Sequence, residues 1–280
     1  MSNTINELRE SPWKILRDII VILALVVGIH TIVAKPFYIP SESMMPLLRN
    51  GDRLVVSKWP YGWSYASVGF HLAPKVEGRI WGKLPQRGDV VVLEHPEQRV
   101  DYIKRVIGLP GDIIEMRRGE LILNGDKVKR EIQPLLPIPV DANLPTSDSA
   151  FANRIRTDAA GQRWVDAPIV RETLPNGVSY DTIDFGPDYS NDNFKPYRVP
   201  ENHVFVMGDN RDASADSRVD FAAKGLGGAV PFDVVSGRAE MVTFSTNGTA
   251  VWYNPLSWWS ALRSGRAGTN LRPDREMGKT

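Results

Sequence analysis

The chain has 280 residues, and its 34 lysines and arginines nearly balance its 33 aspartates and glutamates. This balance gives no support to a nucleic-acid-binding protein that relies on bulk positive charge, and the 42% hydrophobic content is typical of a folded globular protein. The absence of cysteine excludes thiol catalysis, disulfides and thiolate metal sites and leaves the redox compartment open. With only four histidines as well, we predict no metal and no cofactor.

One segment near the N-terminus is uncharged and strongly apolar. Residues 19–34 read IIVILALVVGIHTIVA, and with their charged flanks they reach the length of about 17–25 residues that crosses a bilayer. We predict an uncleaved transmembrane anchor at 18–35, after a cytoplasmic segment at 1–17, although the basic residues favour this orientation only weakly. The alternatives are a buried core helix and a cleaved signal sequence, but the bulky Ile32 disfavours cleavage after Ala34.

The chain after residue 35 has the pattern of a mainly β protein. Short runs rich in Val and Ile, such as 53–57, 89–93 and 102–107, are bounded by Gly, Pro, Asn and Asp. Asn124-Gly125 is a hairpin turn signal, and no long helical period occurs outside the apolar segment. We predict an antiparallel β-sheet or barrel-like domain built from residues 36–128 and 203–262.

Residues 129–202 are rich in proline and polar clusters, and we predict that they form an inserted smaller β lobe. The alternative is a long surface loop. The polar residues 263–280 predict a flexible tail. Before it stand Trp252, Tyr253, Trp258 and Trp259, which fit either a membrane interface or ordinary packing.

Common catalytic motifs are absent, including H-E-x-x-H, the P-loop and the G-x-S-x-G elbow. Three unusual segments carry the functional signal instead. Residues 39–48 read IPSESMMPLL, which by composition alone could be a linker. In residues 102–112, Lys104 and Arg105 are adjacent in a strand pattern, so alternation sends them to opposite faces and one should point into the protein. A buried, unpaired lysine avoids the cost of burial by becoming neutral, and a neutral lysine is a base.

The third segment, residues 207–218, reads MGDNRDASADSR. It is too charged for a core strand. Its charges predict either an ion-pair scaffold beside a site or a solvated turn, and the residues concerned are Asp209, Arg211, Asp212, Asp216 and Arg218.

Together these segments resemble the motifs of bacterial type I signal peptidases, the leader peptidases, which are membrane-anchored Ser/Lys proteases. The matching stretches are 40–46, 51–52, 87–91, 104–112 and 208–218, in the family's order and after an apolar segment. The resemblance covers about residues 34–244, with the proline-rich insertion poorly matched. Three positions depart from the family's pattern: Glu42 in place of Gly, Leu47 in place of Thr, and Ala213 in place of Asn.

The resemblance implies a role for each matching residue. Ser43 is the expected nucleophile and Lys104 the general base. Ser41 and the backbone N–H of Ser43 are the expected oxyanion hole, and Ser214 is expected to orient the lysine. A supporting polar cluster is expected from Arg105, Asp209, Asp216 and Arg218. Pockets for small substrate side chains are expected from Phe37, Ile39, Met44, Leu48, Tyr102 and Ile103.

The implied function is a serine endopeptidase that removes N-terminal signal peptides from exported preproteins after small residues at −1 and −3, through an acyl-enzyme. The expected partners are these preproteins, the lipid bilayer and the export machinery, with no nucleic acid. The expected place is the bacterial cytoplasmic membrane, with a single span and the catalytic domain on its outer face. The alternatives are a Ser/Lys autoprotease-repressor, a pilin-processing peptidase and a non-catalytic binding protein.

Overall fold

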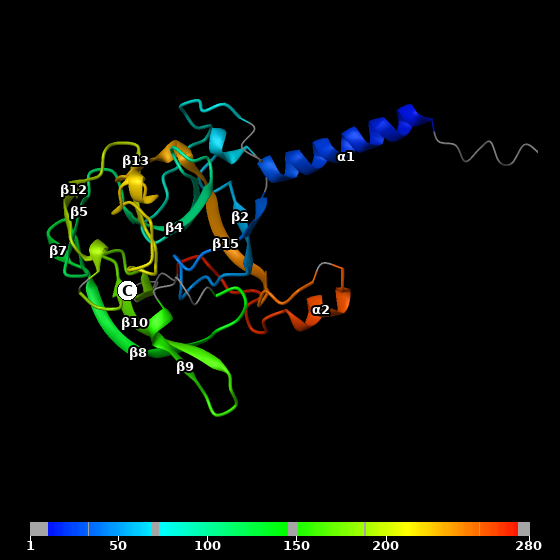
Figure 1. Cartoon of the computed structure of the whole chain (residues 1–280). Coiled ribbons are helices and arrows are strands. Elements are labelled where there is room, and N and C mark those ends of the chain that lie inside the picture. Colours follow the sequence, from blue (N-terminus) through cyan, green and yellow to red (C-terminus); the bar gives the residue numbers. More distant parts are fainter. Residues whose placement is uncertain are drawn as a thin grey trace, which may run out of the picture.

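The computed structural model describes residues 11–32, 34–68, 73–144, 151–187, 189–251 and 253–273. Helix α1 (Pro12–Ile32) projects from one side of a body made of strands (Figure 1). Its described apolar side chains are largely exposed, among them Trp13 at 78% and Leu25 at 60%. No helix in the described residues is long and apolar enough to span a bilayer.

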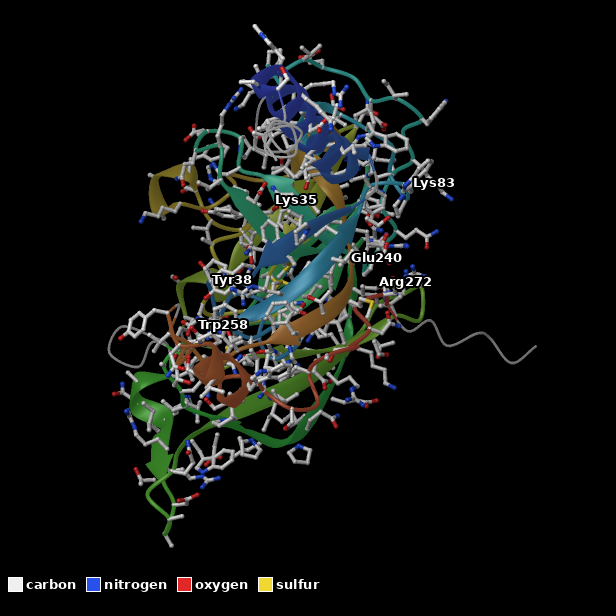
Figure 2. All side chains as sticks on the ribbon, turned by 90° about the vertical axis from the view of Figure 1, so that its right-hand side faces the viewer. Lys35, Tyr38, Lys83, Glu240, Trp258 and Arg272 are labelled. Carbon is white, nitrogen blue, oxygen red and sulfur yellow. The ribbon has the colours of Figure 1, made fainter. Side chains whose placement is uncertain are left out.

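The largest sheet has seven antiparallel strands in the order β1-β2-β15-β3-β4-β13-β14. Its members are β1 (Ala34–Tyr38), β2 (Asp52–Ser57), β15 (Val235–Ser245), β3 (Val90–Glu94), β4 (Asp101–Gly108), β13 (His203–Met207) and β14 (Val230–Pro231). Every residue of β3 is buried, which explains why its sequence is continuously apolar up to Glu94 instead of alternating. Figure 2 faces the β1-β2-β15 side, with Lys35 and Tyr38 toward opposite ends of β1.

Two four-stranded sheets complete the body. One has the order β11-β10-β8, with β9 also paired to β10, and the other has the order β12-β5-β6-β7. The first, called the second sheet below, consists of β8 (Lys129–Pro139), β9 (Ile155–Thr157), β10 (Arg163–Thr173) and β11 (Ser179–Ile183). The other consists of β5 (Ile113–Arg117), β6 (Glu120–Leu123), β7 (Asp126–Lys127) and β12 (Phe194–Arg198).

These sheets confirm the prediction of a mainly β, antiparallel fold. The predicted lobe boundaries at 129 and 202 stay a prediction. The second sheet lies wholly within this range, whereas β12 pairs with β5, which precedes it. The chain therefore returns from the second sheet to the sheet of β5 before it enters β13.

The C-terminal region differs from the expected flexible tail. Residues 263–273 follow the short helix α2 (Pro255–Ser260) and pack against the body. Arg263 pairs with Asp141 at 2.6 Å, Arg266 pairs with Asp52, and Leu271 is 2% exposed. The arginines that make this segment look polar thus hold it in place, while residues 274–280 lie outside the described residues.

The aromatic residues next to this segment are exposed, which excludes core packing for the described ones. Tyr253 is 72%, Trp258 50% and Trp259 77% exposed, and Trp258 lies on the side that faces the viewer in Figure 2. Trp252 lies outside the described residues.

Candidate active site

Ser43 lies in the loop between β1 and β2. A short helical turn forms there, with the Met45 N–H bonded to Glu42 O at 3.0 Å and the Leu48 N–H to Met44 O at 2.9 Å. The turn buries the apolar side chains that follow the serine, since Met44 and Leu48 are 0% exposed and Met45 is 1% exposed. These apolar anchors determine where the serine hydroxyl lies.

Lys104 reaches this hydroxyl from β4, 61 residues further along the chain. Its Nζ donates to Ser43 Oγ at 2.9 Å and to Ile103 O at 3.0 Å. Both residues are buried, with exposed fractions of 7% for Ser43 and 3% for Lys104. A serine hydroxyl becomes a useful nucleophile when a base within hydrogen-bond distance takes its proton, and the Lys104 amine lies at such a distance.

Burial also brings the lysine toward its neutral form. Desolvation lowers the pKa of Lys104 from 10.5 to about 8, and Arg218 acts in the same direction. The carboxylates of Asp216 and Asp209 oppose this change without cancelling it. The structure therefore provides a lysine that is partly deprotonated near neutral pH, as a general base requires.

Lys104 and Arg105 are both buried, whereas strand alternation alone predicted that one of them points inward. Arg105 is 3% exposed, and its Nε and Nη2 donate to the two carboxylate oxygens of Asp209 at 2.7 and 2.6 Å. Its Nη1 donates to Gly88 O at 2.8 Å. Both faces of β4 are covered here, and the paired, hydrogen-bonded guanidinium makes the second buried cation tolerable.

The charged segment 207–218 forms buried ion pairs instead of a solvated turn. Arg218 holds Asp216 through Nε–Oδ1 at 3.0 Å and Nη2–Oδ2 at 2.9 Å, and the Gly208 N–H donates to Asp216 Oδ2 at 2.9 Å. Burial by itself raises the pKa of Asp216, but Arg218 and these hydrogen bonds bring it below the ordinary value. Among the charged residues of the segment, Asp212 is only partly buried.

Ser214 lies close to the dyad without the hydrogen bond expected of it. Its Oγ is buried and has no hydrogen-bond partner among the described residues. Gly208 makes the close packing possible, because a Cβ there would lie 2.2 Å from Ser214 Oγ and 2.4 Å from Ser43 O. A lysine-orienting role for Ser214 therefore stays a prediction.

Ser41 Oγ lies 3.4 Å from Ser43 Oγ, so the two hydroxyls flank the same space. Five of the six expected pocket residues belong to one apolar cluster: Phe37, Ile39, Met44, Leu48 and Ile103. Tyr102 packs against another cluster, and its ring centroid lies 5.3 Å from Lys104 Nζ. Their roles as an oxyanion hole and as pocket walls stay predictions.

Asn210 is a site residue that the sequence analysis missed. Its backbone N–H donates to Ser43 O at 3.1 Å, and its Nδ2 donates to Glu42 O at 3.3 Å. A lone amide in a charged segment carries no signal of such a contact. His95 and His203, by contrast, are bonded to backbone oxygens, of Gly225 at 2.9 Å and Glu201 at 2.7 Å.

Comparison with known proteins gives one consistent result. The family model of signal peptidases, peptidase S26, matches residues 13–244. The signal peptidase I of Rickettsia akari (strain Hartford) is 32% identical over 266 residues, which cover 92% of this chain and 85% of that protein. The signal peptidase I of Rickettsia bellii (strain OSU 85-389) is 30% identical over 267 residues, which cover 91% and 78%.

A solved structure also matches, but only loosely. It is the crystal structure of a signal peptidase I from Enterococcus faecalis V583, with 25% identity, 56% of this chain and 97% of that chain covered, and a TM-score of 0.28. Since this TM-score is too low for a structural argument, the sequence relationship carries the assignment.

Proposed function

The chain belongs to the signal peptidase family, peptidase S26, and is a serine peptidase. On this premise we propose that it removes signal peptides from exported preproteins, with Ser43 as nucleophile and Lys104 as general base. The observation that carries the proposal is the buried hydrogen bond of 2.9 Å between Lys104 Nζ and Ser43 Oγ. A base at this distance with a pKa of about 8 can do the work that histidine does in other serine proteases.

The reaction follows the usual two stages of acyl transfer. Neutral Lys104 takes the proton of Ser43 Oγ while that oxygen attacks the carbonyl carbon of the scissile bond. The resulting ammonium then gives its proton to the leaving amine as the C–N bond breaks, which leaves an acyl-Ser43 ester. In the second stage Lys104 deprotonates a water molecule that attacks the ester, and the proton returns to Ser43 as the product leaves. Ser41 Oγ and the Ser43 N–H would stabilise the oxyanion in both stages.

The proposed specificity is for small side chains at −1 and −3. Strand β1 is at the edge of its sheet, so an extended peptide can pair with its outer backbone and bring alternate side chains to the cluster below. In that cluster Ile39, Met44 and Leu48 are 0% exposed. A densely packed wall of this kind has room for alanine, whereas a large ring would overpack it.

We place the enzyme at a bacterial cytoplasmic membrane, with residues 18–35 as the anchor and the catalytic body on the outer face. Ser43 is nine residues beyond Ala34, so it can lie no more than about 30 Å from the end of the span. The exposed Tyr253, Trp258 and Trp259 are suited to contact with the bilayer interface.

The test is cleavage of a preprotein by the detergent-solubilised full chain beside its Ser43→Ala variant. We expect the wild type to release the mature protein and the variant to leave the preprotein intact at equal folded concentration. Thr173→Ala is a matched control, because it removes a hydroxyl that hydrogen bonds Ser179 on the surface of the second sheet. Cleavage by Ser43→Ala at the wild-type rate would refute the assignment of the nucleophile.

A further inference from the structure

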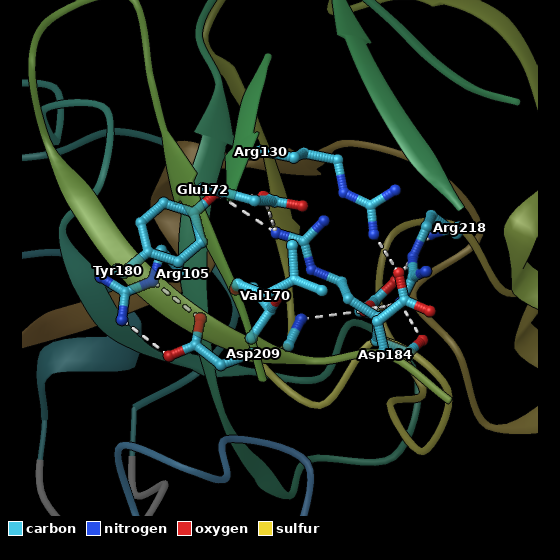
Figure 3. Close-up of polar contacts among 12 residues, drawn as sticks. Arg105, Arg130, Val170, Glu172, Tyr180, Asp184, Asp209 and Arg218 are labelled. Carbon is cyan, nitrogen blue, oxygen red and sulfur yellow. Dashed lines mark hydrogen bonds and ion pairs between the residues drawn. The ribbon is translucent and has the colours of Figure 1, made fainter. Parts of the chain in front are cut away.

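Two buried side chains of the second sheet contact the segment that carries Asp209. Glu172 of β10 and Tyr180 of β11 face each other in register, with exposed fractions of 1% and 7%. Glu172 Oε2 accepts hydrogen bonds from Arg211 Nη2 at 2.7 Å and from the Tyr180 hydroxyl at 2.9 Å. Arg211 Nη2 also approaches the Tyr180 oxygen at 3.2 Å, and Figure 3 shows Glu172 and Tyr180 beside Arg105 and Asp209.

Arg211 depends on these two partners. Within the described residues its Nε and Nη1 are buried without a hydrogen bond, so Glu172 and Tyr180 provide all the described side-chain hydrogen bonds of the guanidinium. A buried cation of this kind is costly unless it is paired. The position of the Arg211 guanidinium therefore depends on the positions of Glu172 and Tyr180.

The Tyr180 ring also supports the neighbour of the proposed base. Arg105 Cζ lies 4.3 Å from the centroid of this ring, a cation–π contact, while its guanidinium is held by Asp209 at 2.6 and 2.7 Å. Because Arg105 directly follows Lys104 in β4, a shift of its guanidinium would be transmitted to the strand that carries the lysine.

The backbone of residues 209–211 connects the second sheet to the nucleophile. On one side, the Ile183 N–H of β11 donates to Asp209 O and the Arg211 N–H donates to Ile183 O, both at 2.9 Å. On the other side, the Asn210 N–H donates to Ser43 O at 3.1 Å. One three-residue segment thus touches the second sheet, the proposed nucleophile and, through Asp209, the neighbour of the proposed base.

We propose that Glu172, Tyr180 and Arg211 form an inter-sheet clamp through which the second sheet sets the distance between Ser43 and Lys104. They are positioning residues, and the proposal rests on the proposed function of Ser43 and Lys104. A misplacement of about 1 Å in an active site can cost about 10²-fold in rate, so loosening the clamp should lower kcat. KM should change little, because none of the three residues belongs to the apolar cluster of the expected pockets.

The test must separate positioning from simple stabilisation. Removing only Glu172 or only Arg211 leaves an unpaired buried charge that can unfold the protein. We therefore choose the apolar triple variant Glu172→Leu/Tyr180→Phe/Arg211→Met, which removes both charges together. Tyr180→Phe alone is the second variant, because it keeps the ring under Arg105. Asp181→Asn is the matched control, since it breaks the exposed pair of Asp181 with Arg171 on the same two strands.

Four quantities are measured on the full chain in detergent: the melting temperature, kcat and KM on a peptide that spans a signal-peptide cleavage site, and hydrogen exchange of the Asn210 amide. For the triple variant we expect a melting temperature near that of the wild type, an unchanged KM, a kcat lowered about tenfold or more, and faster Asn210 exchange. Tyr180→Phe should show the same changes at smaller size, and Asp181→Asn should show none of them.

A folded triple variant with wild-type kcat and wild-type Asn210 exchange would overturn the clamp. So would an equal loss of kcat in Asp181→Asn. If the triple variant does not fold, unchanged kcat and unchanged Asn210 exchange in Tyr180→Phe overturn it, and changes in both support it. A wild type that cleaves no signal peptide would refute the proposed function. Hydrogen exchange needs no substrate, so the exchange rate of the Asn210 amide in the variants would still test whether the clamp exists.

Discussion

Replacing Lys104 by methionine should abolish cleavage and stabilise the fold at neutral pH. The variant loses the hydrogen bonds of Nζ to Ser43 Oγ and Ile103 O, but it also loses the cost of burying an ammonium group. A lowering of the pKa from 10.5 to about 8, chiefly by desolvation, corresponds to about 3 kcal/mol at pH 7. We expect a net gain below this value, because the lost hydrogen bonds offset part of it at about 1 kcal/mol each.

The sign of the pH dependence provides the sharper test. Between about pH 8 and 10.5, unfolded Lys104 keeps its proton while folded Lys104 has released it. The unfolded state therefore binds more protons in this window, and the free energy of unfolding of the wild type should rise with pH across it. In Lys104→Met the rise should be smaller by the share of Lys104, while Lys58, whose pKa burial also lowers to about 8, keeps its own share, so the advantage of the variant disappears toward pH 10.

The assay is urea unfolding in detergent at pH 7, 8, 9 and 10 for the wild type, Lys104→Met and Ser43→Ala. Ser43→Ala serves as the control because it is equally inactive but retains the lysine, so its stability should follow the wild-type pH dependence. If Lys104→Met were less stable than the wild type at pH 7 and kept the same rise with pH, the buried amine would not be the destabilised group that we describe.

Three further results are expected. The kcat/KM of the wild type should fall about tenfold per pH unit below about pH 8. Lys104→Arg should be inactive at every pH, because a guanidinium keeps its proton. A folded Lys104→Arg with substantial turnover would mean that another group is the base. Peptides with Ala at −1 should be cleaved faster than those with Phe by about 1–3 kcal/mol of overpacking, and equal rates would contradict the pocket assignment. Gly208→Ala should lower activity and stability, since its Cβ would lie 2.2 Å from Ser214 Oγ; a melting temperature and kcat equal to those of the wild type would show that the segment can move aside.

The sequence alone was sufficient to predict the class of fold and to propose Ser43 and Lys104 as the catalytic pair. Short runs rich in Val and Ile between turn residues predicted antiparallel strands, because strand propensity and turn signals are local properties. Residue types alone left the segments of Ser43 and of 207–218 open to other interpretations, and the resemblance to signal peptidases supplied their expected roles. Strand alternation predicted that one of Lys104 and Arg105 would be buried, but neither which one nor that both would be.

The remaining features depend on contacts between segments that lie far apart in the chain. The 2.9 Å contact of Lys104 with Ser43 joins β4 to the loop after β1, and local patterns do not encode such a distance. The lack of a hydrogen-bond partner for Ser214 Oγ among the described residues and the packing of residues 263–273 likewise depend on neighbours that only folding supplies. Nothing in the local sequence marks Glu172 and Tyr180, and they contact Arg211 only because β10 and β11 pack beside it. Local sequence determined which groups could do the chemistry, and the tertiary structure decided which of them meet, because burial and ion pairing act across space and not along the chain.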